Sequence, residues 1–357
     1  MSRRGETISV DFTVTIATRN RADSLKEGLK SLTAQSYSSD RYEVIVADNG
    51  STDRTRDVAE GMASDFKNFR YLYDPRPGQL VGWHRALKVA RGNIACFIDD
   101  DVRPEAGWLA GLATSYKDPN VGLATGPIGL EFEADQPTWL DHMRLGDHGG
   151  MTLPFLGLLD CGSSARAIPS NFVWGSNFSA RLNLIKEIGG FHPCAMPGDL
   201  LHFHGDGEIY VGRVIAANGY TAAYHPGASV RHIIPRERLT LAAVAKKFET
   251  TGYARSFQAL RQSGAEYQNP TDDEIVNISR RYFRDWGGAP DDLKQAVIDG
   301  LANGIRNHLH HFIDDPDFRR WVLRDNYLDL DQCYDHPALI AHQAASDRSE
   351  KDWRGGA

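Results

Sequence analysis

Cysteine is scarce in this sequence, and its spacing excludes the small folds that disulfides hold together. Cys96, Cys161, Cys194 and Cys333 are far apart and form no CxxC pair. We therefore expect neither a disulfide framework nor a zinc site of closely spaced thiolates. The distribution is typical of reduced thiols in a cytoplasmic protein, and the apolar run around Cys96 favours a core position.

Long apolar segments and an excess of positive charge are also lacking. No apolar stretch approaches the roughly 20 residues of a membrane span, and the N-terminal segment MSRRGETISVDFTV has no signal-peptide apolar region. The 40 Lys and Arg residues are outnumbered by 47 Asp and Glu residues, which argues against nucleic-acid binding as the main function. We expect no nucleic-acid partner, no transmembrane segment, and a cytoplasmic protein that is either free or peripheral to a membrane.

The sequence does show the alternation of a parallel α/β protein. Of its 357 residues, 41% are hydrophobic, enough for one large core or two modest ones. Between residues 11 and 125, short apolar runs alternate with amphipathic segments, which predicts βαβ units and parallel strands. The predicted strands are 12–17, 43–48, 69–73 and 94–99, and the predicted helices are 21–35, 53–64 and 79–91.

Polar segments follow three of these strands. They are ATRN at 17–20, DNGSTD at 48–53 and DDD at 99–101. Ligands of open α/β sheets bind at the carboxyl ends of the strands, so we expect the three segments to meet in one crevice. Three adjacent carboxylates after a buried strand need a positive charge against them. The alternative is a solvated turn in which Asp101 caps a helix near Glu105.

The remaining chain breaks this alternation. Residues 130–172 are rich in glycine, proline and isolated aromatic residues, which predicts a long loop-rich insertion. Helices are expected at 181–188 and 207–218, and only helices follow Pro235. The resulting division is a first domain of residues 1–235, a helical C-terminal region of residues 236–345, and a flexible tail of residues 346–357.

Four segments together resemble the family-2 glycosyltransferases. They are VTIATRNRADSLKEGLKSLTAQSY, EVIVADNGSTD, ARGNIACFIDDDVRPEAGWL and GSNFSARLNLIKEIGGF, within residues 9–235. The resemblance implies the GT-A fold, a Rossmann-like mixed sheet with helices on both faces, in which residues 9–125 bind the nucleotide and residues 126–235 bind the acceptor. It also implies a metal-dependent inverting enzyme that transfers a sugar from a UDP-, GDP- or dTDP-sugar to an acceptor hydroxyl, with Mn²⁺ or Mg²⁺ as cofactor.

The resemblance assigns the aspartate cluster to the sugar donor and the metal. Asp101 is the implied metal ligand, and His232 in ASVRHIIP is either a second ligand or a structural residue at a strand end. Mg²⁺ uses few carboxylates besides phosphates and water, whereas imidazole suits Mn²⁺ better. Further residues are implied to contact the nucleotide diphosphate, namely Thr18, Arg19, Asp48, Arg76, Gly78, Asp99 and Asp100.

The implied catalytic base lies in HFHGDGEIYVGRVIAANGY. The family's spacing before Gly219 favours Glu208, with Asp206 as the competing candidate. Such a carboxylate would take the proton of the attacking hydroxyl, although both acids would also favour a helix N-terminus through its dipole. The segment WGSNFSAR resembles the floor between the two substrates, which implicates Gly175, Ser176 and Trp174; the indole either stacks on a sugar or belongs to the core.

Two other functions stay open at this point. A nucleotidyltransferase would use a related sheet, but it is expected to carry a glycine-rich phosphate loop after the first strand, and ATRNRADS contains no glycine. A catalytically silent nucleotide-sugar-binding or scaffold protein is the second alternative, because Asn49, Trp83 and His84 depart from the family pattern. His84 is interpreted as structural. The acceptor is unknown, residues 130–172 and the C-terminal helices are expected to select it, and a homodimer through those helices is open.

Overall fold

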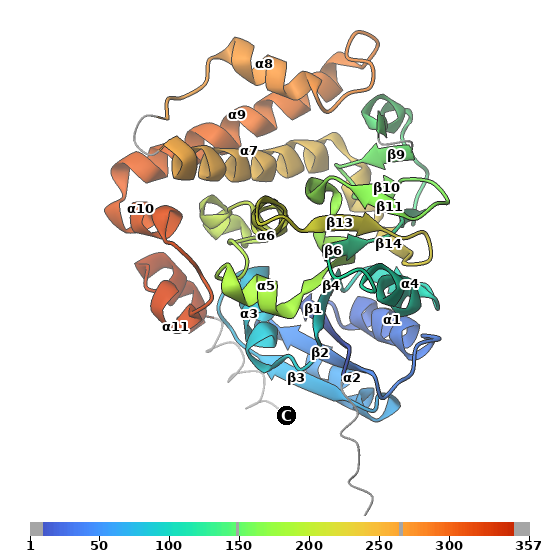
Figure 1. Ribbon diagram of the computed structural model, residues 1–357. Coiled ribbons are helices and arrows are strands. Elements are labelled where there is room, and N and C mark those ends of the chain that lie inside the picture. The colour runs from blue at the N-terminus through green and yellow to red at the C-terminus, as the bar shows by residue number, and fades with distance from the viewer. Residues whose placement is uncertain (1–9, 148–149, 264–266, 346–357) are drawn as a thin grey trace, which may run out of the picture.

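The computed structural model describes residues 10–147, 150–263 and 267–345. The predicted tail of residues 346–357 lies outside these ranges. Before Pro235 the chain forms two mixed sheets and the helices that pack against them, and only helices follow Pro235. Figure 1 shows the long helices of the C-terminal region stacked along one side of the sheets.

The larger sheet has eight strands in the order β11-β13-β6-β12-β4-β1-β2-β3. Strands β4, β1, β2 and β3 run parallel to one another, as predicted, and β1 and β2 are buried along their whole length. Such burial is typical of parallel strands covered on both faces. The strands are β1 (Phe12–Thr18), β2 (Tyr42–Asp48), β3 (Phe69–Tyr73), β4 (Ile94–Asp99), β6 (Val121–Thr125), β11 (Arg166–Ile168), β12 (Phe178–Arg181) and β13 (Thr221–Tyr224).

Five helices of this part agree with the predicted positions, with ends that differ by a few residues, whereas α4 (Trp108–Ser115) was not among the predicted helices. An apolar stripe on each helix faces the sheet, as in the first one, where Leu25, Leu29 and Leu32 are fully buried. The helices are α1 (Ala22–Thr33), α2 (Thr55–Gly61), α3 (Gln79–Val89), α4 (Trp108–Ser115), α5 (Leu182–Glu187) and α6 (Gly207–Ala217). All four cysteines are free and buried, as expected.

The second sheet takes short strands from residues 130–172. Loops and 3₁₀ turns join these strands within the segment, and the sheet runs in the order β5-β14-β7-β10-β9-β8. Strands of three to five residues separated by Gly and Pro are too short to show an alternating pattern in the sequence. The strands are β5 (Val102–Pro104), β7 (Ile128–Phe132), β8 (Leu145–Asp147), β9 (Gly150–Leu153), β10 (Leu158–Asp160) and β14 (Val230–Ile234).

The C-terminal region is helical, as predicted. Its helices are η6 (Arg236–Leu239), α7 (Leu241–Ser263), α8 (Asp272–Arg280), α9 (Asp291–Asp314), α10 (Pro316–Leu323) and α11 (Leu330–Cys333). Helices α7 and α9 pack closely, because a Cβ at Gly252 would lie 2.6 Å from the Leu301 carbonyl oxygen. The TxxE pattern at Thr271 forms a capping box with Glu274 at the start of α8. Within the described residues, no helix combines the length and apolarity needed to cross a bilayer.

Candidate active site

The carboxyl ends of β1, β2 and β4 bring the three predicted polar segments together. Thr18 lies opposite Asp48 in the sheet, and Ala17 lies opposite Asp99. Side-chain contacts join the loops that follow: the Thr18 hydroxyl donates to Asp100 Oδ2 at 2.7 Å, and the Thr52 backbone N–H donates to Asn20 Oδ1 at 2.6 Å. The convergence predicted from the strand ends is therefore present.

Arg21 is the positive charge that lies against the aspartates. Its Nη1 is 3.1 Å from Asp100 Oδ1 and its Nη2 is 3.0 Å from Asp101 Oδ2. Asp100 and Asp101 are only 3% and 7% exposed. Strand β5 begins directly after Asp101 and the next helix begins only at Trp108, so the alternative of Asp101 as a helix cap is wrong.

Asp101 also faces His232, which β14 brings beside β5. The His232 Nδ1 lies 2.9 Å from the Leu156 carbonyl oxygen and donates to it, which leaves Nε2 as the ring nitrogen on the side of Asp101. That Nε2 is 3.4 Å from Asp101 Oδ1, an oxygen that is buried and has no hydrogen-bond partner among the described residues. Arg238 Nη1 donates to the same Nε2 at 3.1 Å.

These two atoms fit a divalent cation that takes its other ligands elsewhere. An orphaned carboxylate oxygen and an imidazole nitrogen, with the second ring nitrogen held by a backbone carbonyl, are a usual protein contribution to such a site, and a cation bound there would replace Arg238 at Nε2. In the part of the chain that the structure describes, no group of three or more His, Cys, Asp or Glu side chains could hold a metal alone. A cation here would therefore need phosphate or water oxygens as well.

The surroundings shift the pKa values of the three aspartates in different ways. Burial raises the pKa of Asp100 to about 7 in spite of Arg21. Burial also acts to raise the pKa of Asp101, but His232 and Arg21 outweigh it and lower that pKa to about 2. Burial and the charge of Asp101 raise the pKa of Asp99, whose Oδ1 accepts a hydrogen bond from Gln79 Nε2 at 2.8 Å. Asp101 is thus the carboxylate that stays ionised.

Of the two candidate bases, only Glu208 faces the aspartates. Its Oε1 accepts a hydrogen bond from the Gly175 backbone N–H at 3.0 Å, and its pKa is raised by burial and by the negative charge of Asp99. Asp206 is occupied elsewhere, because its carboxylate lies 2.5 Å from His192 Nδ1 and 3.3 Å from Arg213 Nη2. Asp206 therefore holds structure at the start of α6.

The segment before β12 lies next to this carboxylate. Gly175 and Ser176 belong to the short helix η4 (Gly175–Asn177), and a Cβ at Gly175 would lie 3.4 Å from Glu208 Oε1. Ser176 is buried. Trp174 is half-buried, and its indole N–H donates to the Asn171 carbonyl at 2.8 Å. Part of the Trp174 ring therefore stays accessible, while its polar atom is already used.

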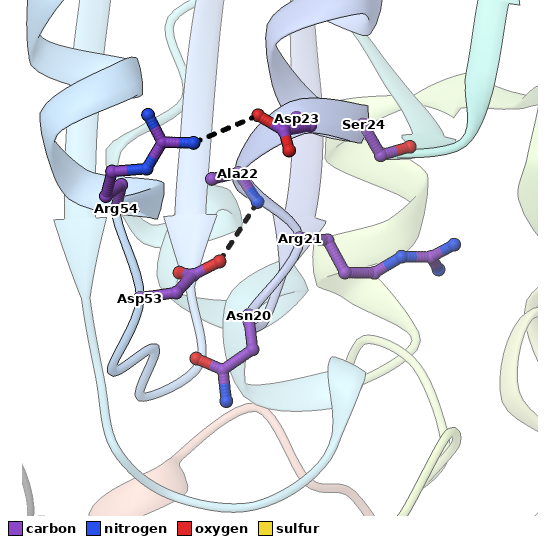
Figure 2. Close-up of a pocket in the computed structure, with 7 residues that line it drawn as sticks. All are labelled: Asn20, Arg21, Ala22, Asp23, Ser24, Asp53 and Arg54. Carbon is purple, nitrogen blue, oxygen red and sulfur yellow. Dashed lines mark hydrogen bonds and ion pairs between the residues drawn. The ribbon is translucent and has the colours of Figure 1, made fainter.

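The first helix begins beside the aspartates at a shallow hollow of about 390 Å³. Figure 2 shows its lining, with Arg54 paired to Asp23, Asp53 accepting from the backbone N–H of Ala22, and the Arg21 guanidinium extending away from both acids. The extended Arg21 side chain is the one that reaches the aspartate cluster.

Three predicted nucleotide contacts have distinct surroundings. Asp48 is 2% exposed and accepts hydrogen bonds from the Ser51 backbone N–H and the Tyr71 hydroxyl, both at 2.7 Å. Arg19 is half-buried and forms no side-chain hydrogen bond or ion pair within the described residues. Arg76 donates hydrogen bonds to the Asp74 carboxylate from Nε and Nη2, and its Nη1 donates to Asp331 Oδ1 at 2.8 Å. Arg76 therefore connects the loop after β3 to the C-terminal region.

The residues at the start of α3, Gly78 and His84 among them, form the remaining side of the site. Gly78 has φ +98°, so the backbone conformation favours glycine, and a Cβ there would lie 2.5 Å from Sδ of the flexible Met196 side chain, which would have to shift. His84 is structural, as interpreted from the sequence: its ring bridges the Tyr327 carbonyl and the Phe191 N–H, both at 2.8 Å.

Sequence reasoning missed four residues of this site. Arg21 and Gln79 lie in segments that had been singled out, but nothing in the sequence distinguishes them from their neighbours. Arg238 and Lys247 come from the helical region, and the charge of Lys247 acts on both Glu208 and Asp99. Their position depends on how α7 packs, which no local pattern reveals.

Comparison with known proteins was made on the sequence and on the fold. Residues 13–175 match the family described as Glycosyl transferase family 2. The chain is 26% identical over 248 residues to the succinoglycan biosynthesis protein ExoM of Rhizobium meliloti, a match that covers 68% of this chain and 72% of ExoM. It is 29% identical over 120 residues to the glycosyltransferase AglE of Haloferax volcanii, covering 33% of this chain and 40% of AglE.

A solved structure has a fold similar to that of this chain. The chain aligns with S. aureus TarS 1-349, in the complex of that protein with UDP-GlcNAc, at a TM-score of 0.50 and 14% sequence identity. The alignment covers 97% of this chain and 92% of the TarS chain. At this identity the likeness concerns the fold alone, and it confirms the expected GT-A architecture with a helical C-terminal region.

Proposed function

We propose, from the site described above and from the similarity of residues 13–175 to glycosyl transferase family 2, that this chain is a metal-dependent inverting glycosyltransferase. It transfers a sugar from a nucleotide diphosphate sugar to an acceptor hydroxyl. Residues 9–125 bind the sugar donor, and residues 126–235 together with the helical region bind the acceptor. The reaction class rests on the site described above and on the family.

One observation carries the proposal. The ionised Asp101 presents a buried oxygen without a hydrogen-bond partner among the described residues, 3.4 Å from His232 Nε2, and the negative charge of Asp99 contributes to the raised pKa of Glu208. Two carboxylate functions with different environments are what a site needs to hold a cation at one point and to move a proton at another. A solvated turn would need neither the burial nor the pairing.

The residues around the aspartates are suited to bind the sugar donor. Asp101 and His232 would hold Mn²⁺ or Mg²⁺, and the bound cation supplies Lewis-acid neutralisation of the leaving diphosphate. Asp99 is oriented by Gln79, and Thr18 fixes Asp100. Arg19 has no partner within the described residues and is available to the nucleotide.

Two further assignments follow from the contacts. The Asp48 carboxylate remains our candidate for the base contact, held in place by Ser51 and Tyr71. Arg76 is engaged by two carboxylates, so we assign it to fastening the C-terminal region rather than to the diphosphate.

Glu208 is the proposed base. It accepts the proton of the acceptor hydroxyl while that oxygen forms its bond to the anomeric carbon. The bond between this carbon and the diphosphate oxygen breaks at the same time, and its electron pair leaves with the nucleoside diphosphate. A raised pKa makes the Glu208 carboxylate a stronger base than an ordinary glutamate, and the Gly175 N–H keeps it in place. Attack from the face opposite the leaving group inverts the configuration.

The test separates binding from transfer. Wild-type protein is incubated with UDP-, GDP- and dTDP-sugars and Mn²⁺, release of nucleoside diphosphate is measured, and binding of the matching diphosphate is followed by thermal shift. Asp101→Asn should lose metal-dependent binding, whereas Glu208→Gln should retain binding and lose transfer. Asp23→Asn, whose carboxylate is exposed at the start of α1, is the matched control and should behave as wild type.

Other outcomes contradict the proposal. Metal-dependent binding without release from any donor would identify a silent nucleotide-sugar-binding protein. Release of pyrophosphate with transfer of a nucleoside monophosphate would identify a nucleotidyltransferase. Transfer that survives Glu208→Gln would remove Glu208 from the mechanism.

A further inference from the structure

Arg238 is a cation of the helical C-terminal region that lies at the candidate metal site. It belongs to the short helix η6, which follows β14 after Pro235, and its side chain is half-buried. Its Nη1 lies 3.1 Å from His232 Nε2, and this contact is the only hydrogen bond or ion pair of its side chain within the described residues. A guanidinium group has five N–H donors and no acceptor, so Nε2 accepts in this contact and most donors of Arg238 stay unused.

The two oxygens of Asp101 have different surroundings. Oδ2 lies 3.0 Å from Arg21 Nη2. Oδ1 is buried, has no hydrogen-bond partner among the described residues, and lies 3.4 Å from His232 Nε2. Because Nε2 accepts from Arg238, this nitrogen and Oδ1 face each other as two acceptors with no proton between them. Burial raises the pKa of Asp99 and acts to raise that of Asp101, and the charge of Arg238 opposes this effect at both carboxylates.

A divalent cation and Arg238 compete for the same nitrogen. The lone pair of Nε2 can be given to a metal or to an N–H donor, but not to both. A cation bound there also meets the positive charge of the guanidinium group, and like charges repel each other more strongly where burial keeps water away. Arg21 does not compete, because it lies against the other oxygen of Asp101. Arg238 therefore opposes the binding of a cation alone.

A diphosphate removes this opposition. Asp101 and His232 leave most positions around the cation to phosphate and water oxygens, so the diphosphate would lie against the cation and close to Nε2. Arg238 Nη1 is 3.1 Å from that nitrogen. A guanidinium group that leaves Nε2 is therefore next to phosphate oxygens, which arginine binds through two parallel N–H bonds.

We propose that Arg238 holds the metal site of the free protein and thereby makes the cation and the diphosphate of the sugar donor bind cooperatively. In the free protein Arg238 donates to the His232 nitrogen. When the cation and the diphosphate bind, it exchanges that nitrogen for phosphate oxygens. The inference rests on the proposed function and adds how the donor site is controlled. It gives Arg238 no chemical step, since the exchange changes only the binding of the metal and the diphosphate.

The first test measures Mn²⁺ binding without a nucleotide, from the loss of the electron paramagnetic resonance signal of free Mn²⁺. Only Mn²⁺ that Asp101→Asn fails to bind is counted. Arg238→Met should bind Mn²⁺ more tightly than wild type by about tenfold or more, because a hydrogen bond from a charged donor no longer has to be broken.

Arg236→Met is the matched control for this test. Arg236 belongs to the same short helix, is exposed, and forms no side-chain hydrogen bond or ion pair within the described residues. This variant should bind Mn²⁺ as wild type does. The inference is overturned if Arg238→Met and wild type bind Mn²⁺ with equal affinity, or if neither of them binds it without a nucleotide.

The second test measures the coupling between the two ligands. The Mn²⁺ titrations are repeated with saturating UDP, GDP or dTDP, whichever binds wild type most tightly. The factor by which the diphosphate strengthens Mn²⁺ binding should be smaller in Arg238→Met than in wild type by about tenfold or more, and Arg236→Met should keep the wild-type factor. Linkage requires that Mn²⁺ strengthens diphosphate binding by the same factor, which calorimetry checks. An equal factor in Arg238→Met and wild type overturns the inference.

The two levels of the proposal fail separately. If none of the three diphosphates binds wild type in the presence of Mn²⁺, the proposed function is wrong. If one of them binds, but Arg238→Met changes neither the affinity for Mn²⁺ alone nor the coupling, only the role of Arg238 is wrong.

Discussion

Replacing Arg21 with methionine should destabilise the metal-free protein, because this side chain is the cation that neutralises two buried carboxylates. Methionine keeps most of the apolar length and removes the charge. Asp100 and Asp101, which are 3% and 7% exposed, would lose the contacts of 3.1 and 3.0 Å that Arg21 makes with them. An unneutralised carboxylate in that environment either remains charged at a cost or takes up a proton.

The ion pairs of Arg21 with Asp100 and Asp101 determine how much stability the Arg21→Met variant should lose. Removing one partner of a buried ion pair costs about 3–5 kcal/mol, whereas an exposed pair contributes about 0–1 kcal/mol. The Arg21 side chain is 45% exposed, and its partners are almost fully buried, which places the pair between these limits. We therefore expect a loss of about 1–3 kcal/mol in the free energy of unfolding, and a melting temperature lower by a few degrees.

The assay is thermal and urea unfolding in EDTA, repeated with Mn²⁺. A cation bound at Asp101 would neutralise the same cluster, so Mn²⁺ should raise the melting temperature of Arg21→Met more than that of wild type. Arg54→Met is the matched control, since Arg54 pairs with Asp23 at 3.3 Å and both side chains are largely exposed; it should change stability by less than about 0.5 kcal/mol. If Arg21→Met is as stable in EDTA as Arg54→Met, the assigned role of Arg21 is wrong.

Three further outcomes are expected. Because the pKa of Glu208 is raised, the transfer rate should fall on acidification at a pH above the ordinary glutamate value of about 4.3, and a pH–rate profile with its limb at or below that value would contradict the assignment. His84→Ala should cost about 3 kcal/mol or more in urea unfolding, since it leaves a buried N–H and a buried carbonyl unpaired. The exposed His310 is the control, and His310→Ala should stay within about 0.5 kcal/mol of wild type. Burial lowers the pKa of His84 and His308 to about 3, whereas both titrate near about 6.5 when unfolded. The unfolded chain thus binds more protons below that pH, and stability should fall on acidification from pH 6.5 toward 4 by up to about 1.4 kcal/mol per pH unit for each histidine. Stability measured by urea unfolding that is flat over this window would show that these rings are not buried as neutral groups.

The sheet and its helices were predictable because near neighbours determine them. The buried runs at Phe12, Tyr42 and Ile94 form strands, and the predicted helix 21–35 is found as Ala22–Thr33. Apolar spacing and breaking residues act over a few positions, so they can be seen in the sequence itself. The short strands within residues 130–172 were not predictable for the same reason, since they are shorter than the patterns that identify a strand.

The aspartate cluster of the site was predictable from the sequence, whereas the residues that contact it were less so. Asp99, Asp100 and Asp101 end a strand at the carboxyl edge of a parallel sheet, so their place in the crevice follows from the topology. The counter-charge was expected to be a metal, yet Arg21 already lies against two of them. Several arginines stand near this strand end in the sequence, and only the turn into α1 decides which one reaches the carboxylates.

The sequence alone determined that Asp99, Asp100 and Asp101 would lie at the carboxyl end of a parallel strand. It also determined that an acidic residue would stand at the start of a later helix, α6. Tertiary structure decided which acid is available, because His192 and Arg213 engage Asp206, whereas the carboxylate of Glu208 accepts from the Gly175 backbone N–H and is affected by the charge of Asp99. It also brought Arg238, just before α7, to His232. Periodicity and end signals are local properties of a chain, whereas the electrostatic surroundings of a side chain depend on every segment folded against it.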